Sequence, residues 1–246
     1  PGRVTGDLPP STSESGGVET GVCERGEGSM FYDPMVAKLV THAANRGDAI
    51  AAMQKALDMY WIRGIETNIP FLASVMAHPR FVRGELTTHF IDEEYPEGFG
   101  ESDMRQADVP MFVSVAAVVH RRYRDRAASI SGQLAGHERE VAAELIVCVG
   151  DDDHAVSVHN VVDESAEHGH CHEVTYDGHC YRVHSDWQFG NPLFTGSING
   201  EPLAVQVERN ELRYRLSQGG GRIDLLVLSP VGARRHRYVP KHVTLV

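Results

Sequence analysis

The chain has 246 residues, of which 41% are hydrophobic and 23% charged, a balance typical of a globular protein with its own buried core. It carries 23 Lys and Arg against 34 Asp and Glu, and the resulting net charge of −11 disfavours nucleic acid and anionic membrane surfaces as partners. The longest apolar-leaning stretch, residues 109–119, is too short to span a membrane, which takes about 20 residues.

The first part of the chain predicts short, mixed elements. Residues 6–29 are rich in Gly, Pro, Ser and Thr and favour loop or weak strand, and residues 29–40 favour an apolar strand interrupted by Tyr-Asp-Pro. Residues 45–61 predict the clearest helix, because apolar residues recur there at three- and four-residue steps. We expect Asp48 to cap this helix and Gly64 to stop it.

A shorter helix is predicted between Asn68, at its N-cap, and Pro79, which ends it. Residues 81–95 then form a turn at Gly84 and a short stretch of apolar and acidic residues. Residues 97–108 hold few apolar side chains and are predicted to link two domains.

Residues 109–132 predict a long helix with one apolar face. The face is marked by Phe112, Val115, Ala116, Val119, Tyr123, Ala127 and Ile130. The second half of the helix holds four arginines on successive sides, which form no single basic stripe: Arg121, Arg122, Arg124 and Arg126. We expect some of them to be solvated and some to pair with neighbouring acids; an acidic partner surface is the alternative, as it is for Arg234, Arg235 and Arg237.

After Gly136 the sequence changes to short strands separated by turns. Asp177-Gly178 and Asn199-Gly200 are two-residue hairpin signals, and Gly219-Gly220-Gly221 marks a third turn. The predicted strands are 141–149, 172–176, 179–184, 193–198, 203–208, 212–216 and 223–228. One helix followed by about eight short antiparallel strands favours a closed or nearly closed meander, and hence an α+β chain.

Histidine is abundant, with 14 in the chain, and several lie close in sequence to cysteines. The cluster comprises His168, His170, Cys171, His172, His179, Cys180 and His184. These residue types suit Zn²⁺, and His168, His170 and His172 would share one side of a strand. Because no CxxC or HxxxH spacing defines a tetrahedral site, a solvated hairpin edge is the alternative, and we assign no metal ligand.

No other pattern identifies a catalytic or cofactor-binding residue. GxxxxGK[ST] and GxSxG are absent, and Gly26-Glu27-Gly28 precedes a predicted strand rather than a helix that could hold a phosphate. Glu93-Glu94 and Asp151-Asp152-Asp153 stand at the ends of elements, where solvated charge is the usual explanation. Four cysteines are too few for a disulfide scaffold, so we expect reduced thiols: Cys23, Cys148, Cys171 and Cys180.

Residues 29–39, Ser-Met-Phe-Tyr-Asp-Pro-Met-Val-Ala-Lys-Leu, resemble the YYDPMIAKL-like segment of biotin carboxylases. Residues 62–72 are similar to the IRGV.TNI.FL turn of that family, and the exit at residues 95–99 narrows the resemblance to the α subunits of propionyl-CoA carboxylases. In that family a biotin-transfer domain, a long helix enclosed by an antiparallel β-barrel, follows the carboxylase domain. The resemblance therefore implies a partial biotin carboxylase C-terminal subdomain over 1–99 and a biotin-transfer domain over 105–246.

The resemblance also implies a two-step ligase. The biotin carboxylase part of the parent enzyme uses ATP, Mg²⁺ and bicarbonate to carboxylate biotin on a carrier domain, and a carboxyltransferase β subunit passes the carboxyl group to propionyl-CoA. The biotin-transfer domain docks the α subunit onto the β subunit in a hetero-oligomer. The implied partners are thus the β subunit and the carrier domain, in a bacterial cytoplasm or a mitochondrial matrix.

Several departures from the family pattern affect what this chain can do. The resemblance places the ATP-binding portion before Pro1 and the biotinylated carrier domain after Val246. Alignment on Glu19-Thr20-Gly21-Val22 puts Gly17 where the family has an active-site arginine, and Arg25 is the nearest arginine. We therefore expect the chain to be inactive alone and to serve as a structural and docking module.

Two connections in the second half are the candidates for contact with the partner, residues 133–140 and 163–169. Because the β subunit selects the acyl group, the α subunit of a methylcrotonyl-CoA or long-chain acyl-CoA carboxylase is an alternative of the same architecture. A histidine-rich, metal-binding β-barrel is an alternative of another class. A nonfunctional truncated homologue is the third, favoured by Gly17.

Overall fold

The computed structural model describes residues 4–10, 16–20, 35–100, 103, 108–134, 136–137, 139–162 and 170–238. The chain forms two compact units, one of Pro1–Gln106, Ala204–Gln206 and Ser217–Arg222, the other of Ala107–Leu203, Val207–Leu216 and Ile223–Val246. Within the described ranges, no helix has the length and apolar character that crossing a membrane requires. The Tyr-Asp-Pro segment, Cys23, Arg25, residues 26–28, His168 and the connection 163–169 lie outside the described residues.

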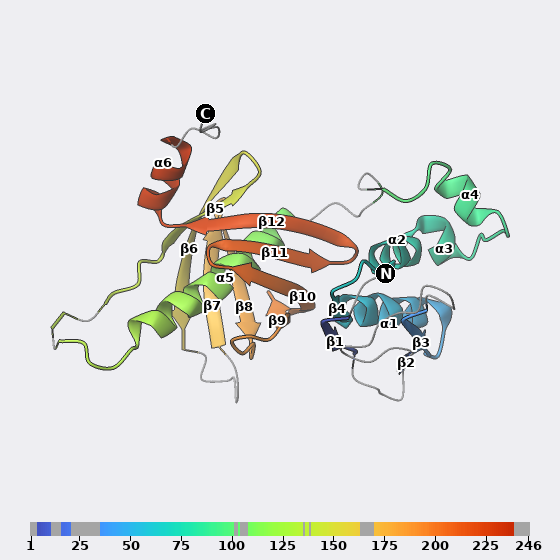
Figure 1. Cartoon of the computed structure of the whole chain (residues 1–246), viewed down its shortest axis with the longest axis horizontal. Helices are drawn as coiled ribbons and strands as arrows, with labels where there is room; N and C mark the ends of the chain where they lie inside the picture. Colours follow the sequence, from blue (N-terminus) through green and yellow to red (C-terminus); the bar gives the residue numbers. More distant parts are fainter. Residues whose placement is uncertain are drawn as a thin grey trace. The chain divides into compact units, whose positions relative to one another are not determined.

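The first unit is built from short strands and helices (Figure 1). Its elements are β1 Gly6–Leu8, β2 Gly16–Thr20, β3 Ala37–Thr41, α1 Arg46–Met59, β4 Trp61–Arg63, α2 Ile69–Ala77, α3 Pro79–Arg83 and α4 Phe90–Glu94. Strand β1 pairs antiparallel with β4, and β2 with β3. Short strands are what the sequence favoured over residues 6–29, as far as those residues are described.

Helix α1 differs from the prediction at both ends. Its N-cap is Asn45, whose Oδ1 accepts a hydrogen bond from the Asp48 amide at 3.0 Å. The prediction that Asp48 caps the helix was wrong: Asp48 lies in the first turn, where its charge favours the positive end of the helix dipole. The helix ends at Met59 rather than at Gly64, because Trp61–Arg63 pair with β1.

The core of the first unit gathers around α2 and α4. Asn68 precedes α2 as expected, although its side chain makes no capping hydrogen bond. Val75, Phe90 and Tyr95 are buried together, and the partly buried Phe71, Met76, Phe81 and Phe99 pack against them. The rings of Phe71 and Tyr95 meet edge to face with their centroids 5.4 Å apart, a favourable arrangement for aromatic pairs.

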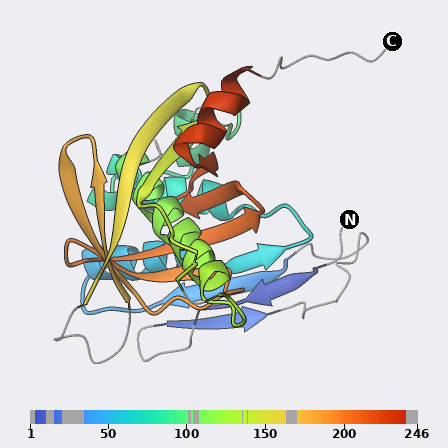
Figure 2. The ribbon, with the colours of Figure 1, turned by 90° about the vertical axis from the view of Figure 1, so that its left-hand side faces the viewer.

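The second unit is a closed barrel of eight strands, which confirms the predicted meander (Figure 2). Its elements are α5 Val109–Ala128, β5 Glu144–Val149, β6 Asp152–Val161, β7 His170–Tyr176, β8 His179–Ser185, β9 Leu193–Ile198, β10 Glu201–Asn210, β11 Arg213–Gln218, β12 Gly221–Leu228 and α6 Pro230–Tyr238. The strands follow one another around the barrel, and β12 pairs antiparallel with β5 to close it.

The two-residue turns set the register of two hairpins. Asp177 and Gly178 have φ of 49° and 73°, and Asn199 and Gly200 have φ of 52° and 87°. Positive φ at both central residues is the requirement of the type I′ turn that joins twisted antiparallel strands. Both hairpins were predicted from these dipeptides and are confirmed.

Strand β6 and helix α6 were missed by the sequence analysis. Strand β6 starts directly after the predicted turn, and the acids and histidines at its ends obscure the alternation around Val156 and Val158. Helix α6 contains a glycine, Gly232, which is a poor helix former, and too few apolar residues to show a helical spacing. Its Ala233 packs with Cys148 and Leu228.

The first half of helix α5 is buried on all sides rather than along one face, so the predicted apolar face describes only part of what is buried. Every residue from Phe112 to His120 is buried, because the strands of the barrel surround this part of the helix. Helices that are buried all round lose the polar face from which amphipathic spacing is recognised. Ala127 and Ile130, which the spacing placed on the apolar face, are exposed, and Ile130 follows the helix end.

Candidate functional site

Gly17 lies in β2, opposite Val40 of β3. A Cβ built on Gly17 would meet no atom within 4 Å, so the position has room for a side chain. As it stands, Gly17 offers only its backbone N–H and C=O, whereas a guanidinium grips an anion through paired N–H groups.

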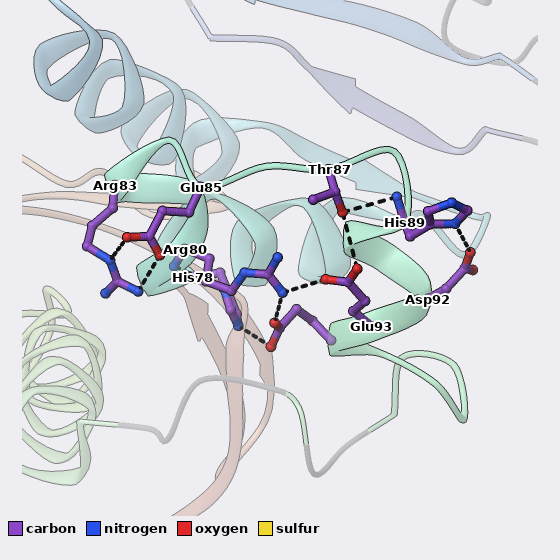
Figure 3. A network of polar contacts seen from close by, with 9 residues as sticks. His78, Arg80, Arg83, Glu85, Thr87, His89, Asp92 and Glu93 are labelled. Atoms are coloured by element: carbon purple, nitrogen blue, oxygen red, sulfur yellow. Dashed lines mark hydrogen bonds and ion pairs between the residues drawn. The ribbon is translucent and has the colours of Figure 1, made fainter.

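A network of polar contacts joins α3 to α4 in the first unit (Figure 3). Arg80 bonds to both Glu93 and Glu94, and the His78 Nε2 lies 3.1 Å from a Glu94 carboxylate oxygen. The hydrogen bond from Arg80 holds the pKa of Glu94 below its ordinary value. Because these acids already have cationic partners, the network explains Glu93-Glu94 as a structural link between two short helices rather than as a catalytic pair.

The barrel encloses a second polar cluster beside α5. The His120 Nδ1 lies 3.1 Å from the Tyr214 hydroxyl, which also accepts a hydrogen bond from Arg209 at 3.1 Å. Burial lowers the pKa of His120 to about 4 and raises that of Tyr214 to about 12, so both are neutral at pH 7. The guanidinium of Arg209 also lies 3.9 Å from the centre of the Tyr123 ring. This cluster satisfies buried polar groups and leaves no activated nucleophile.

The four arginines of α5 have different environments, as expected from their spacing. Arg121 pairs with Asp125 at 2.7 Å and donates to the Val158 carbonyl at 2.9 Å. Arg124 and Arg126 are exposed, while Arg122 is buried. The arginines thus form no common patch.

The histidine cluster is split between the two faces of the β7–β8 hairpin. His170 and His172 lie on one side of β7, with ring centroids 6.4 Å apart, and His172 is buried. On the alternate side, the Cys171 Sγ lies 3.6 Å from the His184 Nε2. Across the described residues, no group of three or more His, Cys, Asp or Glu is arranged to hold a metal ion. Cys148, which is buried, and Cys180, which is exposed, are free thiols.

The connection between α5 and β5 contains one of the two predicted docking segments, residues 133–140. Its Gln133 side chain donates to the Ile130 carbonyl at 3.0 Å and accepts from the Arg139 amide at 2.7 Å. These bonds hold a turn that leaves the side chains of Ile130 and Leu134 65% and 75% exposed. Neighbouring exposed apolar side chains that form a contiguous patch are a feature of protein-binding surfaces.

Two family models cover most of the chain. The model of the propionyl-coenzyme A carboxylase BT domain matches residues 112–242, and that of the biotin carboxylase C-terminal domain matches residues 1–93. The chain belongs to the propionyl-CoA carboxylase alpha-chain family. The resemblance read from residues 29–39, 62–72 and 95–99 is therefore confirmed.

Two propionyl-CoA carboxylase alpha chains agree with this membership. The propionyl-CoA carboxylase alpha chain of Ruegeria pomeroyi is 38% identical over 240 residues, which are 98% of this chain and 34% of the relative. The mitochondrial alpha chain of Mus musculus is 32% identical over 207 residues, 81% of this chain and 27% of the relative. The solved biotin carboxylase domain of a single-chain bacterial carboxylase is 33% identical, with a TM-score of 0.37. The match covers 39% of this chain and 23% of the solved chain.

The propionyl-CoA carboxylase alpha-chain relatives are much longer than this chain, which spans about a third of their length or less. Each family model matches a part of the chain with its own architecture. The biotin carboxylase model matches the helices and two-stranded sheets before residue 100, and the BT-domain model matches the barrel after residue 108.

Proposed function

We propose that the chain is the part of a propionyl-CoA carboxylase alpha subunit that joins the end of the biotin carboxylase domain, residues 1–99, to the biotin-transfer domain, residues 105–246. In this proposal the barrel docks the alpha subunit onto the carboxyltransferase beta subunit. The observation that carries the proposal is the match of the BT-domain model to residues 112–242, within which β5 to β12 form a closed barrel around α5. Biotin, ATP and Mg²⁺ belong to the parent enzyme and bind outside this chain.

The chain is proposed to have no carboxylase activity alone. Gly17 supplies no guanidinium, and the described acids Glu93 and Glu94 are held by Arg80. With ATP, bicarbonate and free biotin, we expect no phosphate release above the buffer rate. Release that rises in proportion to the chain concentration would contradict this part of the proposal.

The α5–β5 connection is proposed as a docking segment because it presents Ile130 and Leu134 to solvent. Burying such side chains against a partner gains about 1.5–3 kcal/mol for each fully covered side chain. Placing a carboxylate there instead would leave a charge to be desolvated in the interface.

The test is a titration of the immobilised chain with a propionyl-CoA carboxylase beta subunit. We expect Leu134→Asp to weaken binding at least tenfold. Val231→Asp is the matched control: Val231 is also exposed and apolar, at 50%, but lies on α6, and its variant should bind like the unchanged chain. Equal affinity of Leu134→Asp and the unchanged chain would exclude this connection as the docking segment. A methylcrotonyl-CoA carboxylase beta subunit serves as the comparison partner for the acyl-CoA alternative.

A further inference from the structure

Arg122 is a buried arginine that has no hydrogen-bonded acidic partner among the described residues. Its side chain leaves α5 between those of Arg121 and Tyr123, and the residue is only 7% exposed. Its Nη1 is buried and makes no hydrogen bond. Burial of a guanidinium without a counter-charge is unfavourable, so an arginine in this state indicates a missing anionic partner.

His172, on strand β7, is a second buried polar group of the same kind. It is 3% exposed, and its Nδ1 is also buried without a hydrogen bond. Burial, together with the charge of Arg122, lowers the pKa of His172 to about 4, so the ring is neutral at pH 7. A neutral imidazole carries one N–H, which can donate to an anion beside the guanidinium.

The surroundings explain why the Arg122 Nη1 and the His172 Nδ1 have no hydrogen-bonding partner among the residues that the structure describes. The guanidinium of Arg122 lies 5.5 Å from the centre of the Trp187 ring and 5.8 Å from that of Phe189, so two of its neighbours are aromatic. The carboxylate of Asp125 is taken by Arg121 and by Asn160, at 2.7 and 2.9 Å. Asp186 raises the pKa of Arg122 through its charge but is exposed and makes no hydrogen bond to it in the described structure.

We propose that Arg122 and His172 form a binding site for a single carboxylate group at this end of the barrel. The planar guanidinium offers paired N–H donors to the two carboxylate oxygens, and the imidazole N–H adds a third donor. The rings of Trp187 and Phe189 lie against the guanidinium and reduce the screening of its charge by water. The carboxylate comes either from a small acid in solution or from an acidic side chain of a protein docked on the barrel.

The first test uses sodium acetate as the probe, with the full chain, against sodium chloride at the same ionic strength. We expect 100 mM acetate to raise the Tm by about 3 °C, as binding with a Kd of about 10 mM would. Arg122→Met should abolish the rise. Arg126→Met is the matched control, because Arg126 is an exposed arginine of the same helix that also lies over the Phe189 ring, and it should keep the rise in full.

The His172 imidazole resonances give a second readout in the unchanged chain, which does not depend on how a variant folds. They should shift with acetate and not with chloride. An unchanged Tm together with unchanged His172 resonances would overturn the proposal and leave Arg122 as a packing residue held by its aromatic neighbours. An acetate response that survives in a folded Arg122→Met variant would overturn it as well.

Adding the beta subunit distinguishes a small acid from an acidic side chain as the source of the carboxylate. This experiment alone depends on the proposed docking function. If an acidic side chain of the docked protein fills the site, acetate should no longer shift the His172 resonances in the complex. If a small acid is the ligand, the shift should persist there. Failure of docking itself would appear as an unchanged mass of the chain, which separates it from failure of the carboxylate site.

Discussion

The two units of the chain reach stability by different means. The barrel closes its sheet, so no strand edge is left unpaired, and it buries large side chains such as Phe112, Phe194 and Leu216 completely. The sheets described in residues 4–100 are two-stranded, β1 with β4 and β2 with β3, and such sheets contribute little stability on their own. The first unit also leaves several large apolar side chains exposed: Leu8, Met35, Val40, Val82, Leu86 and Ile91.

The two units also differ in where their exposed apolar side chains lie. In the first unit they lie on or next to strands and helices, and an apolar groove of about 570 Å³ opens among β3, α1 and α2. In the barrel unit, Val231 lies on α6, and the other exposed large apolar residues lie in connections between elements: Ile130, Leu134, Val162, Phe189 and Leu212. The described strands of the barrel and α5 expose no large apolar side chain. The barrel unit therefore buries the apolar side chains of its strands and exposes others mainly in its connections. The first unit exposes apolar side chains on or beside its strands and helices, so its core is less completely covered.

Each unit carries one of the two tryptophans, Trp61 in the first and Trp187 in the second, so their unfolding can be followed separately. Trp61→Phe leaves Trp187 as the fluorescence reporter of the barrel, and Trp187→Phe leaves Trp61 as the reporter of the first unit. In urea we expect the Trp61 signal to change at a lower concentration than the Trp187 signal. Coincident transitions would contradict the contrast drawn between the units.

The largest expected effect is that of Phe112→Ala, which empties space in the middle of the barrel. Phe112 is 1% exposed, and removing such a ring from a closed core costs about 3–5 kcal/mol in the free energy of unfolding. The loss should appear in the Trp187 transition. Val231→Ala, at an exposed position of α6, should change it by less than about 0.5 kcal/mol.

The next effect is the response of the barrel to acid. Because His120 has a folded-state pKa of about 4 against about 6.5 when unfolded, the unfolded chain binds the extra proton between these values. Stability should therefore fall as the pH falls from about 6.5 to 4, by about 3 kcal/mol from His120. His120→Gln should remove that part of the slope, and His89→Gln, at an exposed position in the first unit, should not. A slope unchanged by His120→Gln would show that the ring is not held neutral.

A smaller effect is expected at the start of α1. Asn45→Ala removes the capping oxygen that accepts from the Asp48 amide and should destabilise the first unit by about 1 kcal/mol. The Trp61 transition should shift and the Trp187 transition should not. Asn68→Ala is the control, because Asn68 occupies the same position before α2 without a capping bond.

The smallest effect is expected for Gly17→Arg. A Cβ at Gly17 meets no atom within 4 Å, so the Trp61 transition should move by less than about 0.5 kcal/mol. A larger loss would mean that the glycine is required by the fold of β2. In a full-length alpha subunit, the same substitution tests whether Gly17 limits biotin carboxylation: a higher rate in the variant would support that view.

Elements whose conformation depends on residues close in sequence could be predicted, whereas elements shaped by contacts distant in sequence could not. The hairpins at Asp177-Gly178 and Asn199-Gly200 were predictable, because only a few residue types tolerate positive φ at both turn positions. The all-round burial of α5 was not, because the surrounding barrel exists only after eight strands have paired. The boundary between α1 and β4 was missed for the same reason: pairing with β1, distant in sequence, draws Trp61–Arg63 out of the helix pattern.

The candidate site was predictable to a lesser degree. The connection 133–140 was chosen from its position between helix and strands, and the exposure of Leu134 supports that choice. The proximity of Arg122 to His172, through which the charge of Arg122 lowers the pKa of His172, was not predictable, since Arg122 was interpreted as part of a charge run and His172 as part of a histidine cluster. The two residues are distant in sequence, and they come together only when the barrel packs β7 against α5. The barrel also buries Arg122 and His172, whereas Arg124 and His170 are exposed.

The most direct test of the docking role is the mass of the unchanged chain in solution, by size-exclusion chromatography with light scattering, alone and with a propionyl-CoA carboxylase beta subunit. We predict that the chain leaves its own elution position and co-elutes at a mass larger than that of the beta subunit alone. Two separate peaks at unchanged masses, with both proteins folded, would contradict the docking role.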